Sequence, residues 1–152
     1  MTSTPLVSKR FALLLMVAAA AGSLALTSVG KIVVGRERPP TDLAVAPFET
    51  SPAFPSGHAL NATVIAGVIA YLVLLRVRSR VGRSLVVVAA VAHPVLMGLS
   101  RVYLGHHWLT DVMVAWCVGL GWLAVVLTVH QVLLRRLGHD DPDRGAVATA
   151  AR

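Results

Sequence analysis

The sequence predicts an all-α protein, a polytopic membrane bundle of four transmembrane helices. Of its 152 residues, 56% are hydrophobic and only 14% are charged, and the mean hydropathy is +0.73. Soluble domains carry about 25% charged residues, so this composition excludes an ordinary cytosolic globule. It also excludes disorder of the whole chain, because disordered segments are poor in apolar residues. Four apolar runs of about 20 residues, the length that crosses a bilayer, indicate the number of helices.

Each apolar run defines one helix, and we expect helices over residues 11–34, 58–76, 84–101 and 108–135. The first run has no charged residue from Phe11 to Gly30. Its start also resembles a secretory signal peptide, but the apolar stretch continues past any cleavage point to spanning length, which favours a retained helix. Residues 1–137 are therefore expected to form one membrane-embedded domain. The polar residues 138–152 are expected to form a disordered cytoplasmic tail.

Basic residues predict the orientation of these helices. Short cytoplasmic loops are enriched in lysine and arginine, and such residues flank the first helix, fill the second connection and follow the last helix: Lys9, Arg10, Arg76, Arg78, Arg80, Arg83, Arg135 and Arg136. With four spans these positions share one side, so both termini are expected in the cytoplasm and residues 35–56 and 101–107 outside. The net charge of +7 is divided between apolar runs rather than spread along one face, which argues against nucleic acid as a partner.

Three polar blocks lie at the outer ends of the predicted helices: Lys31-x6-Arg38-Pro39, Pro55-Ser56-Gly57-His58 and Ser100-Arg101-x5-His107-x3-Asp111. Lys31, Arg36, Arg38 and Arg101 are cations on the side where the topology rule disfavours them, and arginine suits bidentate contact with phosphate oxygens. Ser56 is a predicted N-cap, and the free N–H groups beyond it form an anion site at a helix N-terminus. The pattern predicts a phosphate-binding site. The alternative is that these cations anchor the chain to lipid headgroups.

Two histidines and a carboxylate accompany these cations. His107 and Asp111 are four residues apart, so on a helix they share one face. A carboxylate that binds one imidazole nitrogen leaves the other free for attack, and His58 is then available as the proton donor to a leaving oxygen. The competing hypothesis is a zinc site made of His58, His107 and Asp111. Three cations around the same point favour an anion over a divalent metal, so no metal is expected.

Together the three blocks resemble the signature of the phosphatidic acid phosphatase type 2 superfamily, which includes lipid phosphatases and undecaprenyl-diphosphate phosphatases. The resemblance implies that His107 is the nucleophile and forms a phosphohistidine. It implies that Asp111 orients His107, and that His58 protonates the leaving group and later activates water. It implies that the phosphate oxygens are bound by Lys31, Arg38, Ser56, Gly57 and Arg101. It also implies that neither a cofactor nor a metal is required.

We therefore expect a metal-independent phosphoric ester or anhydride hydrolase of a bacterial cell membrane, with membrane lipids around it and its active site on the extracytoplasmic side. The expected substrate is a lipid phosphate or diphosphate, such as undecaprenyl diphosphate or a lipid resembling phosphatidic acid. Two alternatives stay open. One is a catalytically incomplete protein that binds lipid phosphates, and the other is a small four-helix transporter, although the first three apolar runs lack the acidic residue that such carriers need.

The helix count departs from the pattern of the family that the motifs resemble. Integral membrane members carry further helices ahead of the first block, whereas here one helix precedes Lys31, so two helices are absent. We expect either a chain that is truncated at its N-terminus or a homo-oligomer in which a second copy completes the bundle.

Overall fold

The computed structural model describes residues 9–139 and consists of four long helices, with one short helix between the first two. In chain order these are α1 (Lys9–Val34), the 3-10 helix η1 (Thr41–Leu43), α2 (Gly57–Leu74), α3 (Arg80–Tyr103) and α4 (Leu109–His139). Each of the four long helices is long and apolar enough to cross a membrane. The predicted all-α fold with four transmembrane helices is therefore confirmed.

The last helix extends further than the apolar run indicated. α4 ends at His139, whereas the sequence indicated an end near residue 135. The first two residues of the predicted tail, 138 and 139, therefore belong to α4. The rest of that tail, residues 140–152, and residues 1–8 lie outside the part of the chain that the structure describes.

Serine side chains determine where two of the helices begin. Ser56 is the N-cap of α2, and its hydroxyl accepts a hydrogen bond from the backbone N–H of Ala59 at 3.5 Å. Ser79 caps α3 in the same way, through the N–H of Gly82 at 3.1 Å. Serine is a favoured N-cap because its oxygen satisfies an N–H that has no intrahelical acceptor. The cap at Ser79 explains why α3 starts four residues before the predicted residue 84.

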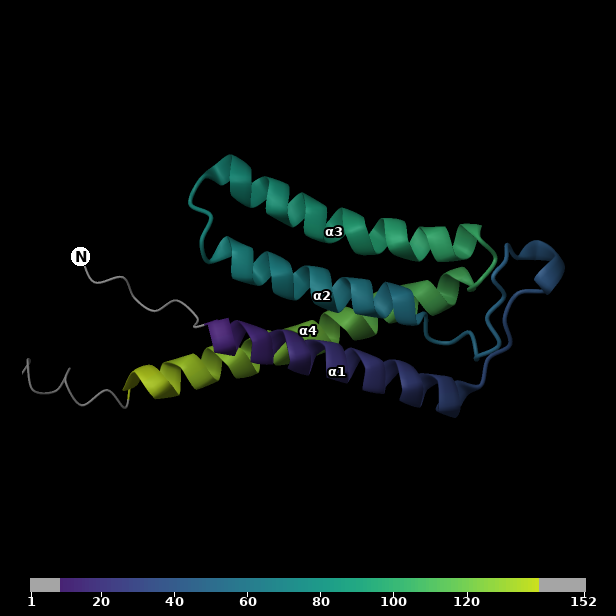
Figure 1. Ribbon diagram of the computed structural model, residues 1–152, viewed down its shortest axis with the longest axis horizontal. Coiled ribbons are helices and arrows are strands. Elements are labelled where there is room, and N and C mark those ends of the chain that lie inside the picture. The colour runs from purple at the N-terminus through teal and green to yellow at the C-terminus, as the bar shows by residue number, and fades with distance from the viewer. Residues whose placement is uncertain (1–8, 140–152) are drawn as a thin grey trace, which may run out of the picture.

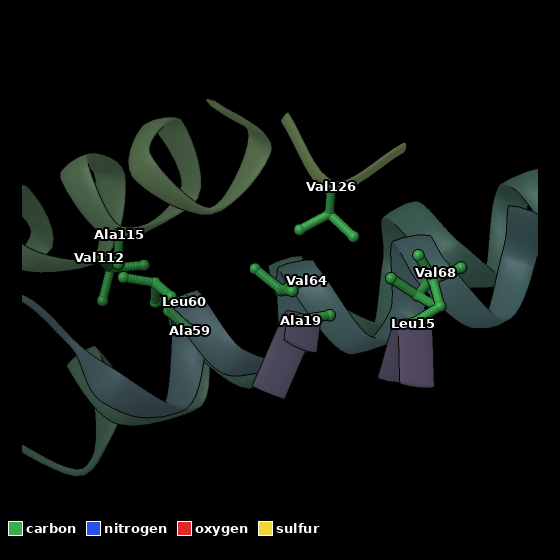
Figure 2. Packing of buried hydrophobic residues seen from close by; sticks show 9 residues of the cluster. All are labelled: Leu15, Ala19, Ala59, Leu60, Val64, Val68, Val112, Ala115 and Val126. Carbon is green, nitrogen blue, oxygen red and sulfur yellow. The ribbon is translucent and has the colours of Figure 1, made fainter. Parts of the chain in front are cut away.

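Small and branched apolar side chains from α1, α2 and α4 form the core, as Figure 2 shows. The cluster consists of Leu15, Ala19, Ala59, Leu60, Val64, Val68, Val112, Ala115 and Val126. The buried residues of α3 are only Pro94 and Gly98, and this helix lies along α2 on the side away from α1 (Figure 1). Most of the surface of α1 and α3 is apolar and exposed, as expected of helices that contact lipid.

The long connection between α1 and α2 and the short turn between α3 and α4 lie at one end of the bundle, and the α2–α3 connection lies at the other (Figure 1). Gly105, with φ +70°, lets the two loops approach each other, because a Cβ there would lie 2.3 Å from the carbonyl oxygen of Leu43. A hydrogen bond of 3.0 Å from the N–H of Val45 to the carbonyl of Leu104 joins the loops. The polar blocks of the sequence therefore meet at this end of the bundle.

Candidate active site

One cavity of about 470 Å³ lies between α1, α2 and the two loops. Its polar end is lined by Lys31, Glu49, Ser51, Gly57, His58 and His107. Its other end runs along α1 and α2 and is lined by Ala20, Ser23, Leu24, Thr27 and Asn61. Four of the predicted site residues therefore line the same cavity. These are Lys31 from α1, Gly57 and His58 from α2, and His107 from the loop between α3 and α4.

His107 is almost completely buried, with 2% of its surface exposed. Its Nδ1 lies 2.7 Å from the carbonyl oxygen of Ala53. A carbonyl oxygen can only accept, so Nδ1 carries the proton and donates it, and in the neutral ring Nε2 keeps a free lone pair. Burial, followed by the positive charge of Arg38, lowers the pKa of His107 to about 4. The imidazole is therefore neutral at physiological pH, which is the form that a nucleophile requires.

Asp111 is fully buried, and both of its oxygens accept hydrogen bonds from groups other than His107. Oδ1 accepts from Arg36 at 2.9 Å, and Oδ2 accepts from the backbone N–H of Trp108 at 2.9 Å. The second bond is the arrangement in which an acidic side chain in the first turn reaches back to the residue before the helix. Oδ2 lies 3.8 Å from Nδ1 of His107, so the orientation of His107 by this carboxylate stays a prediction.

Arg38 connects the two loops at the polar end of the cavity. Its guanidinium donates to the carbonyl oxygens of Ser51 at 2.7 Å and His106 at 2.6 Å, and to the carboxylate of Glu49 at 2.6 Å. Only 12% of the side chain is exposed. Arginine is suited to this arrangement because its donors form a rigid, planar fork. Arg38 is therefore held in one position before any ligand binds.

Lys31, at the end of α1, is positioned by the same loop. Its Nζ donates to Ser51 Oγ at 3.0 Å and to the carbonyl of Pro52 at 2.5 Å. Within residues 9–139 no carboxylate forms an ion pair with it. The charge of Lys31 is thus not neutralised by contact and is available to an anion in the cavity.

Arg101 lies in the last turn of α3, and its Nε is buried without a hydrogen-bond partner among the described residues. A buried donor without an acceptor is costly, and an anionic ligand would satisfy it. Ser56, also buried, is used structurally: its hydroxyl caps α2, and its N–H donates to the carbonyl of Asp111 at 3.3 Å. The residues that line the cavity do not include Arg38, Arg101, Ser56 or Asp111.

Three further groups, which are not among the predicted site residues, determine this geometry. The carbonyl of Ala53 holds His107, Arg36 pairs with Asp111, and Glu49 lines the cavity. Burial opposes ionisation of Glu49, but the charges of Arg38 and the neighbouring cationic groups outweigh it and lower the pKa of this carboxyl below its ordinary value. Arg36 had a usable signal, since it is a basic residue on the side that the topology rule disfavours.

A sequence profile of the PAP2 superfamily matches residues 12–135 of the chain. The chain belongs to the PAP2 superfamily. This confirms the family that the three motifs resemble, and the match extends over all four helices of the structure.

A curated protein and a solved structure, both from Bacillus subtilis, are similar to this chain. It is 41% identical over 97 residues to phosphatidylglycerophosphatase B, an alignment that covers 62% of this chain and 46% of that protein. The crystal structure of a transmembrane PAP2 type phosphatidylglycerolphosphate phosphatase matches the fold with a TM-score of 0.71 and 35% identity, over 78% of this chain and 58% of that one. The chain therefore spans about half the length of the PAP2 relatives it matches.

The zinc hypothesis concerned His58, His107 and Asp111. Among the residues that the structure describes, no three histidine, cysteine, aspartate or glutamate side chains are grouped so that they could hold a metal ion. Nδ1 of His107 donates to Ala53, and the Asp111 oxygens accept from Arg36 and Trp108. Lys31 lines the cavity and Arg38 holds the loops beside it, and these positive charges favour an anion over a metal cation.

Proposed function

We propose that this PAP2 protein is a membrane phosphatase that removes a phosphoryl group from a lipid at the extracytoplasmic face, through a phosphohistidine on His107. The observation that carries the proposal is the hydrogen bond from Nδ1 of His107 to the carbonyl of Ala53. It leaves the lone pair of Nε2 unused on a neutral imidazole that lines a cavity together with Lys31 and His58. A neutral imidazole next to fixed cations is the combination that attack on a phosphate requires.

In the first step, Nε2 of His107 attacks the phosphorus and the bond from phosphorus to the lipid oxygen breaks. His58, in its protonated form, gives its proton to this oxygen, so the lipid leaves as an alcohol. Lys31, Arg38 and Arg101 stabilise the negative charge on the phosphoryl oxygens. The first backbone N–H groups of α2, beginning with that of Gly57, have no intrahelical acceptor and also stabilise this negative charge.

In the second step, His58 removes a proton from water, and the water oxygen attacks the phosphorus. The bond from phosphorus to Nε2 breaks, which releases inorganic phosphate and restores neutral His107. The side chain of His58 is exposed and lines the cavity, so water reaches it directly. Asp111 acts on His107 across 3.8 Å as a negative charge that stabilises the ring when it carries the phosphoryl group.

The distribution of arginines supports an extracytoplasmic site. Basic residues lie at the end of the bundle opposite the cavity, where α1 begins, α2 is connected to α3 and α4 ends (Figure 1). They include Arg10 near the start of α1, Arg78 in the connection and Arg135 near the end of α4. Lysine and arginine in short loops mark the cytoplasmic side. We infer that both termini are cytoplasmic and that the loops around the cavity face outward.

Labelling of single cysteines tests this orientation. In a Cys117→Ser background, a membrane-impermeant maleimide added to intact cells should modify Phe48→Cys, an exposed position in the long loop. It should modify Arg78→Cys only after the membrane is permeabilised. The reverse pattern would contradict the proposed side.

The comparisons suggest phosphatidylglycerophosphate as the substrate, because the similar curated protein and the similar crystal structure are both named for it. The cavity suits a lipid, since it starts at the cations and continues along α1 and α2 to apolar residues, Ala20 and Leu24. A substrate can therefore keep its chains beside the helices while its phosphate lies at the polar end. We propose a glycerolipid phosphate as the substrate class.

Phosphate release by the purified full chain, in mixed micelles with phosphatidylglycerophosphate, tests the mechanism. His107→Asn should reduce turnover by at least about a thousandfold, as loss of a nucleophile does. His106→Asn is the matched control, because His106 is the adjacent buried histidine and its ring makes one hydrogen bond among the described residues, which Nε2 donates to the Val45 carbonyl. A phosphorylated intermediate that is acid-labile should form in the parent chain and be absent in His107→Asn. Turnover retained by His107→Asn would contradict the mechanism.

A further inference from the structure

The cavity wall beyond the phosphate end contains a polar pair, Ser23 on α1 and Asn61 on α2. Ser23 Oγ lies 2.9 Å from both Asn61 Oδ1 and the backbone carbonyl oxygen of Ala20, so these two acceptors share its one proton, and only 2% of Ser23 is exposed. Both residues lie within helices that are apolar enough to span a membrane. An amide at this depth is costly unless its hydrogen-bonding groups find partners. The pair therefore calls for a reason beyond filling space.

Pairing with Ser23 accounts for only one end of the Asn61 amide. The amide has an oxygen that accepts and a nitrogen with two N–H donors. The oxygen accepts from Ser23, whereas no residue within 9–139 accepts from Nδ2. The side chain of Asn61 is exposed and lines the cavity. The two N–H donors of Asn61 are therefore available to a molecule in the cavity.

The position of Asn61 along α2 places these donors next to the reaction centre. Asn61 follows His58 by three residues, so both lie on one face of the helix, about 4.5 Å apart along its axis. Ala20 lines the cavity about one turn of α1 further from Lys31 than Ser23 does, and it offers no polar side-chain group. The donors thus lie between the phosphate-binding end and the apolar end of the cavity.

Lipids differ in what they carry at this distance from the phosphate. In a glycerolipid phosphate, the glycerol unit next to the phosphate bears oxygens, as hydroxyl, phosphodiester or ester groups, and all of them accept hydrogen bonds. In an alkyl or polyprenyl phosphate the same positions are carbon. A hydrogen-bond donor at this position would therefore bind a glycerolipid phosphate. An alkyl or polyprenyl phosphate would remove water from the donor without offering it an acceptor.

We propose that Asn61 is a specificity-determining residue whose Nδ2 donates to an oxygen of the glycerol unit of the substrate, and that Ser23 is a positioning residue which holds the amide in this orientation. The assignment rests on the proposed phosphatase function and adds the structural class of lipid that the site selects.

The test compares two substrates in each variant, phosphatidylglycerophosphate and hexadecyl phosphate, which has no oxygen beyond its phosphate. In Asn61→Leu, kcat/KM for the glycerolipid should fall about three- to tenfold, the effect of losing one hydrogen bond. The value for hexadecyl phosphate should stay within about twofold of the parent value or rise, since the unsatisfied donor is gone. The ratio of kcat/KM for phosphatidylglycerophosphate to kcat/KM for hexadecyl phosphate should therefore fall in Asn61→Leu. In Ser23→Ala the same ratio should fall by a smaller factor.

The ratio is measured within one preparation, so a smaller folded fraction lowers both rates and leaves it unchanged. A fall in both rates by the same factor in Asn61→Leu and in Ser23→Ala would show that the pair only packs the helices, and would overturn the assignment while leaving the phosphatase intact. A parent chain that hydrolyses neither lipid would overturn the proposed function and the assignment with it. A ratio that falls in Asn61→Leu supports both.

Discussion

His107 and Ala53 are joined by a hydrogen bond of 2.7 Å from the imidazole Nδ1 to the backbone carbonyl. Ala53 itself is fixed, because its N–H donates to the carbonyl of Arg36 at 2.8 Å. Three residues later, Ser56 caps the helix that carries His58. The short segment from Ala53 to Ser56 therefore orients one histidine and starts the helix of the other, which links the positions of the two proposed catalytic groups.

The first prediction concerns the protonation of His107. Burial and the charge of Arg38 lower its pKa to about 4, so the ring should stay neutral from physiological pH down to about that value. The ¹⁵N chemical shifts of a histidine-labelled sample in micelles should include one imidazole that titrates near pH 4, and its signals should be absent in His107→Asn. Arg38→Gln should move that titration to higher pH, because a nearby positive charge is removed. An ordinary titration near pH 6.5 in the parent chain would contradict the buried, neutral imidazole.

The folded and unfolded states then differ in how many protons His107 binds. The pKa is about 4 in the folded chain and about 6.5 in the unfolded one, so between these values the unfolded state binds more protons. The free energy of unfolding should therefore rise with pH across this window. Comparison of thermal unfolding midpoints at several pH values, in the parent chain and in His107→Asn, isolates this contribution as the difference between the two slopes. If the midpoint changes with pH by the same slope in both chains, His107 does not contribute to the pH dependence of stability.

The helices and the meeting of the three motifs could be predicted from sequence because they depend on local properties. Apolar runs of spanning length determine the helices, and four spans bring alternate loops to one end. The acceptor of His107 could not be predicted, because a backbone carbonyl is present at every residue and carries no sequence signal. The pairing of Arg36 with Asp111 joins residues 75 positions apart, and nothing local to either residue indicates it. Asn61 did have a local signal, since it is an amide inside an apolar run.

The ion pair between Arg36 and Asp111 gives a second prediction about stability. The 2.9 Å contact joins a fully buried carboxylate to a partly exposed guanidinium that also donates to Thr110 Oγ1 and stacks on Trp108. A double-mutant cycle of Arg36→Gln and Asp111→Asn, measured by unfolding in micelles, should give a coupling energy of about 1–2 kcal/mol. A second cycle, of Arg36→Gln and Thr110→Val, measures the hydrogen bond from Arg36 to the neutral hydroxyl of Thr110. Its coupling energy should be smaller than that of the charged pair. Additive effects of the charged pair would show that the contact contributes nothing to stability.

Glu49 gives a prediction about affinity for phosphate. Its carboxylate lines the cavity and occupies the guanidinium of Arg38 at 2.6 Å in the absence of ligand. Glu49→Gln removes a negative charge that repels an incoming phosphate and competes for Arg38. The inhibition constant of inorganic phosphate should fall by about two- to fivefold, the effect of one partly exposed charge. Glu37→Gln, on an exposed residue whose side chain makes no described ion pair, is the matched control and should leave it unchanged. A higher inhibition constant in Glu49→Gln would mean that Glu49 positions Arg38 for binding.

The last prediction concerns the close approach of α1 to the start of α2. A Cβ on Gly57 would lie 3.0 Å from Cγ2 of Thr27, and the next nearest atom, Oγ1 of Thr27, would lie at 3.8 Å. Gly57→Ala should therefore push the two helices apart beside Lys31 and His58, at a cost of about 1–3 kcal/mol for an overpacked contact, and lower phosphatase activity. Thr27→Ser removes only Cγ2 and keeps the hydroxyl, so it relieves the contact without changing polarity. The double variant should regain most of the activity and of the unfolding midpoint lost in Gly57→Ala. If it regains the midpoint but not the activity, Gly57 is needed for the approach of phosphate to the backbone rather than for helix packing.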